Sequence, residues 1–276
     1  MIWFIIAVSV ILLALLFLIW QNIYLQTSYY EIVSDKIKGN GEMKILHISD
    51  LQNSKYPLFY SKISKLMAKQ NPDFIVFTGD IIDRRKYNLD NAKEFIEKIK
   101  SIAPIYFVSG NHEAWCGKDY EVYSMLKKQG VAILDDENKS LSNGEIEINL
   151  IGIKDVGYLA RPSISEEQKK ELVAMIKSLK TDDYSVLLTH RPELINEYAA
   201  ADVDLVLCGH AHGGQFRLPI IGALYAPHQG IFPKYTAGVH IVNNTTEIIN
   251  RGLGSGKLQF RTFNRPEISV ITIKSE

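Results

Sequence analysis

The chain opens with an uninterrupted apolar run. Residues 1–20 contain no charged side chain, and Ser9 is the only small polar residue among them. A run of this length matches the roughly 30 Å hydrocarbon core of a bilayer and leaves no polar face for water. A cleaved signal peptide is the alternative, but the run has no basic segment before it and no small-x-small cleavage site after it. We therefore expect a single-pass transmembrane anchor over residues 1–22, followed by a linker over residues 23–42.

Beyond this linker, short apolar runs alternate with segments of helical spacing. The runs with the length of buried strands are residues 44–49, 74–77, 105–108, 131–134, 146–153, 186–189, 205–208, 238–242, 246–250 and 268–273. The segments with helical spacing are residues 60–69, 89–100, 120–129 and 165–179. This order predicts an α/β domain over residues 43–276, built as a four-layer α/β/β/α sandwich in which helices flank two mixed sheets.

Several of the apolar runs end in a turn that carries Asp, Asn, Gln or His. The segments are ILHISDLQ (45–52), FIVFTGDIID (74–83), IYFVSGNHE (105–113), SVLLTH (185–190) and DLVLCGHAHGGQ (204–215). Two loop histidines alone would be read as solvated side chains. Carboxylates and imidazoles gathered from five strand ends would instead repel or lose hydration at a cost, unless cations occupied the space between them. Mixed Asp, Asn and His ligands suit divalent Mn, Fe, Zn or Mg.

Charge and cysteine content narrow the functional classes. The chain has 31 Lys and Arg residues and 31 Asp and Glu residues, so its formal net charge is zero. A neutral chain lacks the basic surface that drives non-specific nucleic-acid binding, so a nuclease is disfavoured. Its two cysteines, Cys116 and Cys208, form neither a disulfide framework nor a cysteine-based zinc site.

The five motifs together resemble the calcineurin-like metallophosphoesterase superfamily. That family carries D-x-H, GD-x-x-D, GNH-[DE], H and GH-x-H in this order. The matching residues are Asp50-x-Gln52, Gly79-Asp80-x-x-Asp83, Gly110-Asn111-His112-Glu113, His190 and Gly209-His210-x-His212. HRPE at 190–193, GGQ at 213–215 and RGLG at 251–254 further resemble its bacterial membrane-associated branch.

The resemblance implies a site for two divalent metal ions. The implied ligands are Asp50, Gln52, Asp80, Asn111, His190, His210 and His212. Asp80 would bridge the ions. Residues 50, 52 and 212 would complete the coordination of the first ion, and residues 111, 190 and 210 that of the second ion. A hydroxide held between the ions would attack phosphorus.

The resemblance also implies roles for residues that do not bind the ions. His112 would stabilise the transition state or protonate the leaving group, and Glu113 would orient it. Asp83 would lie one layer outside the ligands. Arg84 resembles the phosphate-binding arginine of the Ser/Thr-phosphatase branch, although a basic residue just after a strand is more often solvated.

Gln52 departs from the family pattern, which has histidine at this position. An amide oxygen can coordinate a hard metal, but it is a weaker donor than imidazole to Zn or Fe. Either the first site fills with lower affinity and a shift towards Mn or Mg, or Gln52 no longer binds and the chain is a catalytically impaired binding scaffold. His47 could be proposed as a substitute ligand, but strand alternation puts it on the face opposite Asp50, where we expect a buried or cap-facing histidine.

We therefore expect a metal-dependent hydrolase of phosphoric esters, located at the cell membrane. Its substrate would be a phosphodiester, phosphomonoester or pyrophosphate, and the anchor favours a lipid-linked one. The stretch from 213 to 236 has little regular periodicity, and stretches of this length in compact domains are usually functional. Its apolar side chains predict either a lipid-facing rim or a self-packed loop.

Overall fold

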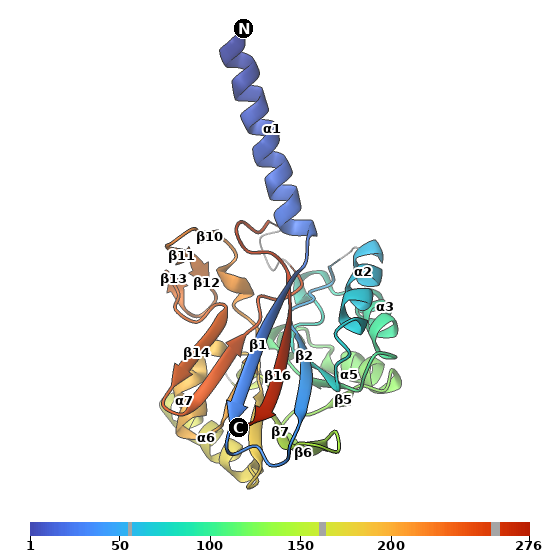
Figure 1. Cartoon of the computed structure of the whole chain (residues 1–276), viewed down its shortest axis with the longest axis vertical. Coiled ribbons are helices and arrows are strands. Elements are labelled where there is room, and N and C mark those ends of the chain that lie inside the picture. The colour runs from blue at the N-terminus through green and yellow to red at the C-terminus, as the bar shows by residue number, and fades with distance from the viewer. Residues whose placement is uncertain (55–56, 160–163, 255–259) are drawn as a thin grey trace.

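Two six-stranded sheets form the centre of the computed structural model (Figure 1). The structure describes residues 1–54, 57–159, 164–254 and 260–276. The first sheet has the order β1 (Gln26–Ser34), β16 (Glu267–Ser275), β2 (Glu42–Ile48), β3 (Phe74–Thr78), β4 (Ile105–Val108) and β5 (Ala132–Ile133). The second has the order β14 (Gly238–Val242), β15 (Thr245–Ile249), β9 (Leu205–Cys208), β8 (Tyr184–Leu188), β7 (Glu147–Gly152) and β6 (Glu137–Ser142). Both sheets mix parallel and antiparallel neighbours, as predicted.

Helices cover the outer face of each sheet, so the predicted four-layer sandwich is confirmed. The helices of the first sheet are α2 (Pro57–Ala68), α3 (Leu89–Ile99) and α5 (Asp119–Lys128), and those of the second are α6 (Glu166–Leu179) and α7 (Ile195–Ala200). Apolar side chains fill the space between the sheets, where Val76 and Val108 share a core with Val186 and Leu188. Each such buried side chain stabilises the fold by roughly 1.5–3 kcal/mol. Because the central strands are buried on both faces, their sequences are continuous apolar runs.

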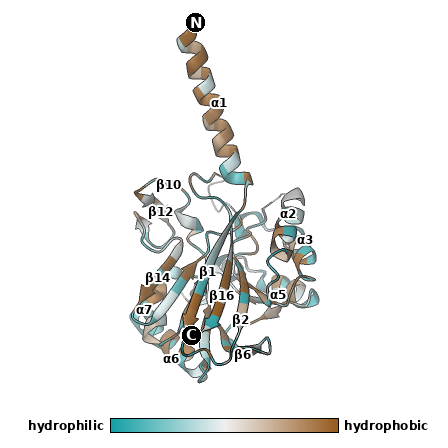
Figure 2. Cartoon of the chain, viewed as in Figure 1, coloured by the Kyte–Doolittle hydropathy of each residue, from teal (hydrophilic) through white to brown (hydrophobic). Residues whose placement is uncertain are grey.

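Helix α1 (Ile2–Ile23) projects from this body (Figure 1). It is apolar along most of its length and becomes hydrophilic in its last turn, beside the body (Figure 2). Its 22 residues are long and apolar enough to cross a membrane, and its most apolar stretch is 0% buried.

The linker expected over residues 23–42 contains β1, so the sheet starts at Gln26 rather than at Met43. β1 runs parallel to β16, with Gln26 opposite Glu267 and Ser34 opposite Ser275. As the edge strand of the sheet it has only partial burial, and its residues QTSYYEIVS therefore lack a strong apolar pattern. Only two residues, Tyr24 and Leu25, separate α1 from β1.

The strand ends that carry the polar motifs lie at the end of the body from which α1 leaves. β1 follows α1 and runs away from it, with β16 parallel to β1. β2 is antiparallel to β16, so β2 and its parallel neighbours β3 and β4 run towards α1. The motifs that follow these strands are therefore close to the base of the helix (Figure 1).

Candidate metal centre

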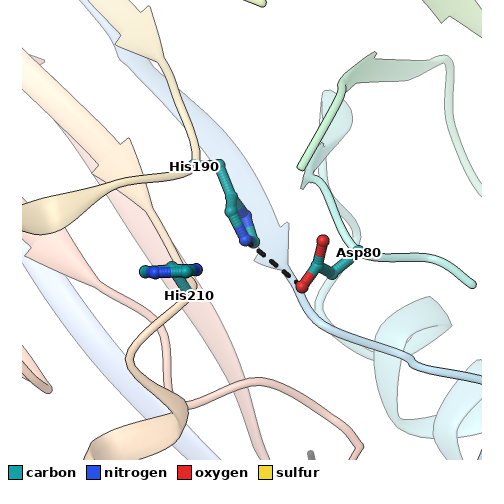
Figure 3. Close-up of side chains that lie close together, drawn as sticks. All are labelled: Asp80, His190 and His210. Carbon is teal, nitrogen blue, oxygen red and sulfur yellow. Dashed lines mark ion pairs between the residues drawn. The ribbon is translucent and has the colours of Figure 1, made fainter. Parts of the chain in front are cut away.

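Acidic and histidine side chains from both sheets meet around Asp80, which lies just after β3. Asp80, His190 and His210 offer ligand atoms that all lie within 4.8 Å of one another. Asp50, Asp80 and His212 form a second group by the same criterion. Figure 3 shows the first group, in which His190 and Asp80 point towards each other. The two groups share Asp80, so they offer two neighbouring cation sites with one carboxylate in common.

The two amide residues of the predicted ligand set lie at the same place. Gln52 Nε2 is 3.1 Å from Asp80 Oδ2 and 3.0 Å from His212 Nε2. Asn111 lines the cavity that Gln52 and Asp80 also line. The fold thus brings together all seven residues that the sequence singled out as ligands.

The turns that carry these side chains adopt uncommon backbone conformations. Asp50, Gln52, Asp80, His210 and His212 have φ angles of 52°, 46°, 56°, 65° and 47°, in the left-handed region. Non-glycine residues in sparsely populated regions cost on the order of 1–3 kcal/mol each, and they cluster at functional sites. Five such residues in one centre indicate that the fold holds these side chains in place at the expense of local stability.

Glycine permits the two central loops to approach closely. A Cβ atom on Gly79, whose φ is +85°, would lie 2.5 Å from the backbone nitrogen of Gly110. The glycines of the GD and GN motifs therefore let the Asp80 and Asn111 turns meet.

Several buried atoms of the centre have no hydrogen-bond partner among the described residues. They are Asp50 Oδ1, Gln52 Oε1, Asn111 Oδ1, His190 Nε2 and His210 Nε2. Each can offer a lone pair, and a buried polar atom left unsatisfied costs roughly 1–3 kcal/mol. Divalent cations would accept these lone pairs, so the residues present fit a two-metal site with mixed oxygen and nitrogen ligands.

His190 is oriented as a metal-binding histidine requires. Its Nδ1 lies 2.7 Å from the carbonyl oxygen of Thr78, so Nδ1–H donates and Nε2 is left to face Asp80. Burial lowers the pKa of His190, but the Asp80 carboxylate outweighs this and raises it to about 10. Burial likewise opposes ionisation of Asp80, yet His112 and His190 hold the pKa of that carboxyl well below its usual range. Positive charge is therefore favoured between the two side chains.

His112 lies beside the cluster, with Nε2 3.8 Å from Asp80 Oδ2. The backbone N–H of Arg84 donates to its Nδ1 at 3.1 Å, which puts the proton of the neutral ring on Nε2. Asp83 Oδ1 is 3.4 Å from the same Nδ1 and accepts from it when the ring is charged. Burial lowers the pKa of His112, but Asp80 and Asp83 outweigh it and raise the pKa above its ordinary value.

Glu113 does not contact the His112 ring as the sequence suggested. Its Oε2 accepts from the backbone N–H groups of Asp80 and Gly110, and its Oε1 accepts from that of Ile82. A buried carboxylate with three backbone donors at strand ends ties the two loops together. Asp83, expected one layer outside the ligands, takes the place beside His112 instead.

Arg84 and His47 are placed differently from the ligands. The exposed Arg84 guanidinium stacks over the ring of Trp115, 5.2 Å from its centroid, at the side of the cavity. His47 is fully buried and bonds Thr78 Oγ1 at 2.9 Å, as strand alternation predicted. Burial lowers the pKa of His47 to about 3, so this histidine is neutral.

Residues outside the sequence motifs form a wall of the cavity, which has a volume of about 200 Å³. Trp115, Tyr225, Pro227 and His228 line it together with the cluster. The His228 ring stacks on His210 with centroids 5.2 Å apart. An isolated loop histidine is usually solvated. The only signal in the sequence that His228 lines the cavity is therefore its position within the aperiodic 213–236 stretch.

Comparison with known proteins agrees with this geometry. Residues 43–214 match the family described as calcineurin-like phosphoesterase. The chain is 30% identical to the metallophosphoesterase YkuE of Bacillus subtilis, over 91% of this chain and 86% of the relative. It is 27% identical to the phosphodiesterase YaeI of Escherichia coli, over 91% and 90%. The NAD nucleotidase of Haemophilus influenzae shares the fold, with a TM-score of 0.53 at 16% identity, over 78% of this chain and 46% of that one. The chain therefore belongs to the calcineurin-like phosphoesterase family and is a hydrolase of phosphoric esters.

Proposed function

We propose that the chain is a membrane-anchored hydrolase that uses two divalent metal ions to cleave a phosphodiester, phosphomonoester or pyrophosphate. The observation that carries this proposal is the pair of ligand groups that share Asp80. The unsatisfied lone pairs around them support it further. The exposed apolar helix α1 supports the membrane anchor.

The residues present divide between the two ions around Asp80, which would bridge them. Asp50, Gln52 and His212 would hold the first ion, and Asn111, His190 and His210 the second. Two bound divalent ions supply positive charge to the phosphate oxygens and an activated water for attack on phosphorus. Thr78 fixes the tautomer of His190 through its carbonyl oxygen, so that Nε2 on the side of Asp80 would be free to bind an ion.

His112 would act as the general acid. In the charged ring, Nδ1–H donates to the carboxylate of Asp83, and Nε2–H is left to donate a proton to the leaving oxygen. After the proton has left, Nδ1 of the neutral ring accepts from the backbone N–H of Arg84. This histidine also lines the cavity. A binding scaffold would have no use for a buried histidine held in this way beside the ligands, so we favour the enzyme over the scaffold.

Removal of metal is expected to abolish hydrolysis of bis-p-nitrophenyl phosphate, because the centre would lose the positive charge that binds the phosphate. We expect a rate loss of about 10³-fold or more after dialysis against a chelator, and recovery when Mn²⁺ is added back. Elemental analysis should find about two ions per chain before dialysis. Undiminished turnover after exhaustive chelation would refute the proposal, and a panel of monoesters and pyrophosphates would define the substrate class.

Replacing Gln52 by histidine is expected to strengthen the first metal site. An imidazole is a better donor than an amide oxygen to Zn or Fe, so the chelator concentration that halves activity should rise by roughly tenfold or more. The Gln52→Leu variant has no donor atom at this position, so the chelator concentration that halves its activity should fall. If neither variant changes metal content or rate, residue 52 is not a ligand.

We further propose that the substrate is linked to a lipid. The supporting observation is that the strand ends bearing the centre lie at the end of the body from which α1 leaves. A centre at that end is close to any bilayer that α1 enters.

A further inference from the structure

Exposed apolar side chains gather at the tips of two short hairpins beside the cavity. β10 (Arg217–Leu218) pairs with β11 (Gly222–Ala223), and β12 (Tyr225–Ala226) pairs with β13 (Gly230–Ile231). We call their exposed apolar residues, together with a neighbouring phenylalanine, the apolar rim: Leu218, Ile220, Ile221, Ile231, Phe232 and Phe263. In Figure 1 the hairpins lie at the end of the body from which α1 leaves. Exposed apolar side chains that gather on one part of a protein are candidates for an interaction surface.

Ile220 has an exposure and a backbone conformation that are unusual for isoleucine. It is fully exposed and has a φ of 70°. A β-branched residue in the left-handed region is a strained outlier, where glycine or asparagine is usual. Packing within the chain gives no reason for isoleucine at a fully exposed turn. An apolar environment outside the protein would provide one.

The rim is continuous with helix α1. The rings of Phe263 and Phe17 of α1 have centroids 5.1 Å apart. Phe263 follows Thr262, whose carbonyl oxygen accepts a hydrogen bond from the backbone N–H of Arg217 in β10 at 3.0 Å. A path of direct contacts therefore runs from the apolar helix to the hairpins.

Hydrogen bonds attach the last turn of α1 to the body. Asn22 donates to the Arg261 carbonyl at 3.1 Å and accepts from the Arg261 backbone N–H at 2.8 Å. The backbone N–H of Asn264 donates to Gln21 Oε1, while Asn264 Nδ2 donates to the carbonyl oxygen of His212 at 2.7 Å. One residue thus connects the last turn of the helix with a turn of the metal centre, which is held close to the base of α1.

The side chains around this joint suit the lipid headgroup region. Trp20 and Tyr24 lie at the base of α1, with Arg265 and Lys62 over their rings at 5.0 Å and 4.4 Å. Aromatic and basic side chains of this kind are enriched where a helix leaves the bilayer. The hairpins that bear the rim lie at the same end of the body (Figure 1).

We propose that the apolar rim inserts into the membrane beside α1 and presents the metal cavity to phosphate groups at headgroup level. The partner is the lipid bilayer itself. Tyr225 and Pro227 come from the hairpins that bear the rim and also line the cavity. The inference rests on the proposed function for its membrane anchor, and it adds a second contact with lipid and a fixed orientation of the site.

The test uses the full chain in vesicles of phosphatidylcholine and phosphatidylglycerol. Cys116 is first replaced by serine, and Cys208 is buried and stays unlabelled. An environment-sensitive fluorophore is then attached to Ile220→Cys, and its quenching by spin-labelled lipids is measured. We expect a depth of about 5–10 Å below the headgroup boundary. Phe232→Cys provides a second reporter if labelling distorts the turn at 220. The matched control is Ile241→Cys, an exposed isoleucine opposite Thr246 at the far end of the second sheet, which should not be quenched.

The outcomes separate this inference from the proposed function. If the labels at 220 and 232 stay unquenched while the protein hydrolyses bis-p-nitrophenyl phosphate, the inference is overturned and the proposed enzyme is unaffected. The rim would then fit a protein partner. Equal quenching at 241 would overturn it as well, because contact would then not be specific to the rim. Quenching at the rim in protein that hydrolyses no ester under any metal would support the surface and refute the enzyme.

Discussion

Replacing Asp80 by asparagine is expected to abolish activity and to empty the metal centre. Both candidate ligand groups contain Asp80, so one substitution removes a ligand from each of them. The neutral amide also removes negative charge that would attract both ions. We expect hydrolysis of bis-p-nitrophenyl phosphate to fall by about 10³-fold or more, and elemental analysis to find the metal content reduced.

A buried aspartate at the other end of the second sheet provides the control. Asp204 precedes β9, where it pairs with Lys36 and accepts from Ser185, away from the metal-bearing strand ends. Asp204→Asn should keep the metal content and the rate, although it loses charge-assisted bonds and so some stability. A variant Asp80→Asn that keeps two ions and the full rate would remove the basis of the two-metal assignment.

Replacing His112 by glutamine is expected to slow catalysis and leave the metal content unchanged. His112 lines the cavity, and its Nδ1 accepts from the backbone N–H of Arg84 in the neutral ring. General-acid catalysis contributes roughly 10²–10⁴-fold, so kcat should fall by about that factor. The loss should be larger for an alkyl ester than for a nitrophenyl ester, because nitrophenolate leaves readily without a proton.

Leaving-group dependence and metal content together distinguish an acid from a ligand. Asp80→Asn should lose ions, whereas His112→Gln should keep them. If the His112 variant loses metal, or if it slows both kinds of ester equally, then His112 binds an ion or phosphate and does not protonate the leaving group.

The cluster itself could be predicted from the sequence because each of its residues follows a strand. Parallel strands in one sheet bring their carboxyl ends to the same edge, so Asp50, Asp80 and Asn111 had to lie close together once β2, β3 and β4 were recognised. Strand alternation likewise determined that His47 is buried away from the ligands. These inferences need only local periodicity and the order of the strands.

The edge strands β1 and β6 could not be predicted in this way. β6 is largely exposed and β1 only partly buried, so neither carries a clear apolar pattern. β1 becomes a strand because its hydrogen bonds come from β16, whose residues lie some 240 positions away in the chain. Such a long-range pairing has no trace in the local sequence.

The apolar run, the polar turns and the succession of the buried strands along the chain were therefore decided by the sequence alone, since each is a matter of local pattern. Only the tertiary structure decided that Asp83 rather than Glu113 stands beside His112. It also placed His228 on the cavity wall and linked Gln21 through Asn264 to His212. These contacts join loops whose conformation depends on which neighbouring strands they connect, and short-range patterns carry no information about distances between loops.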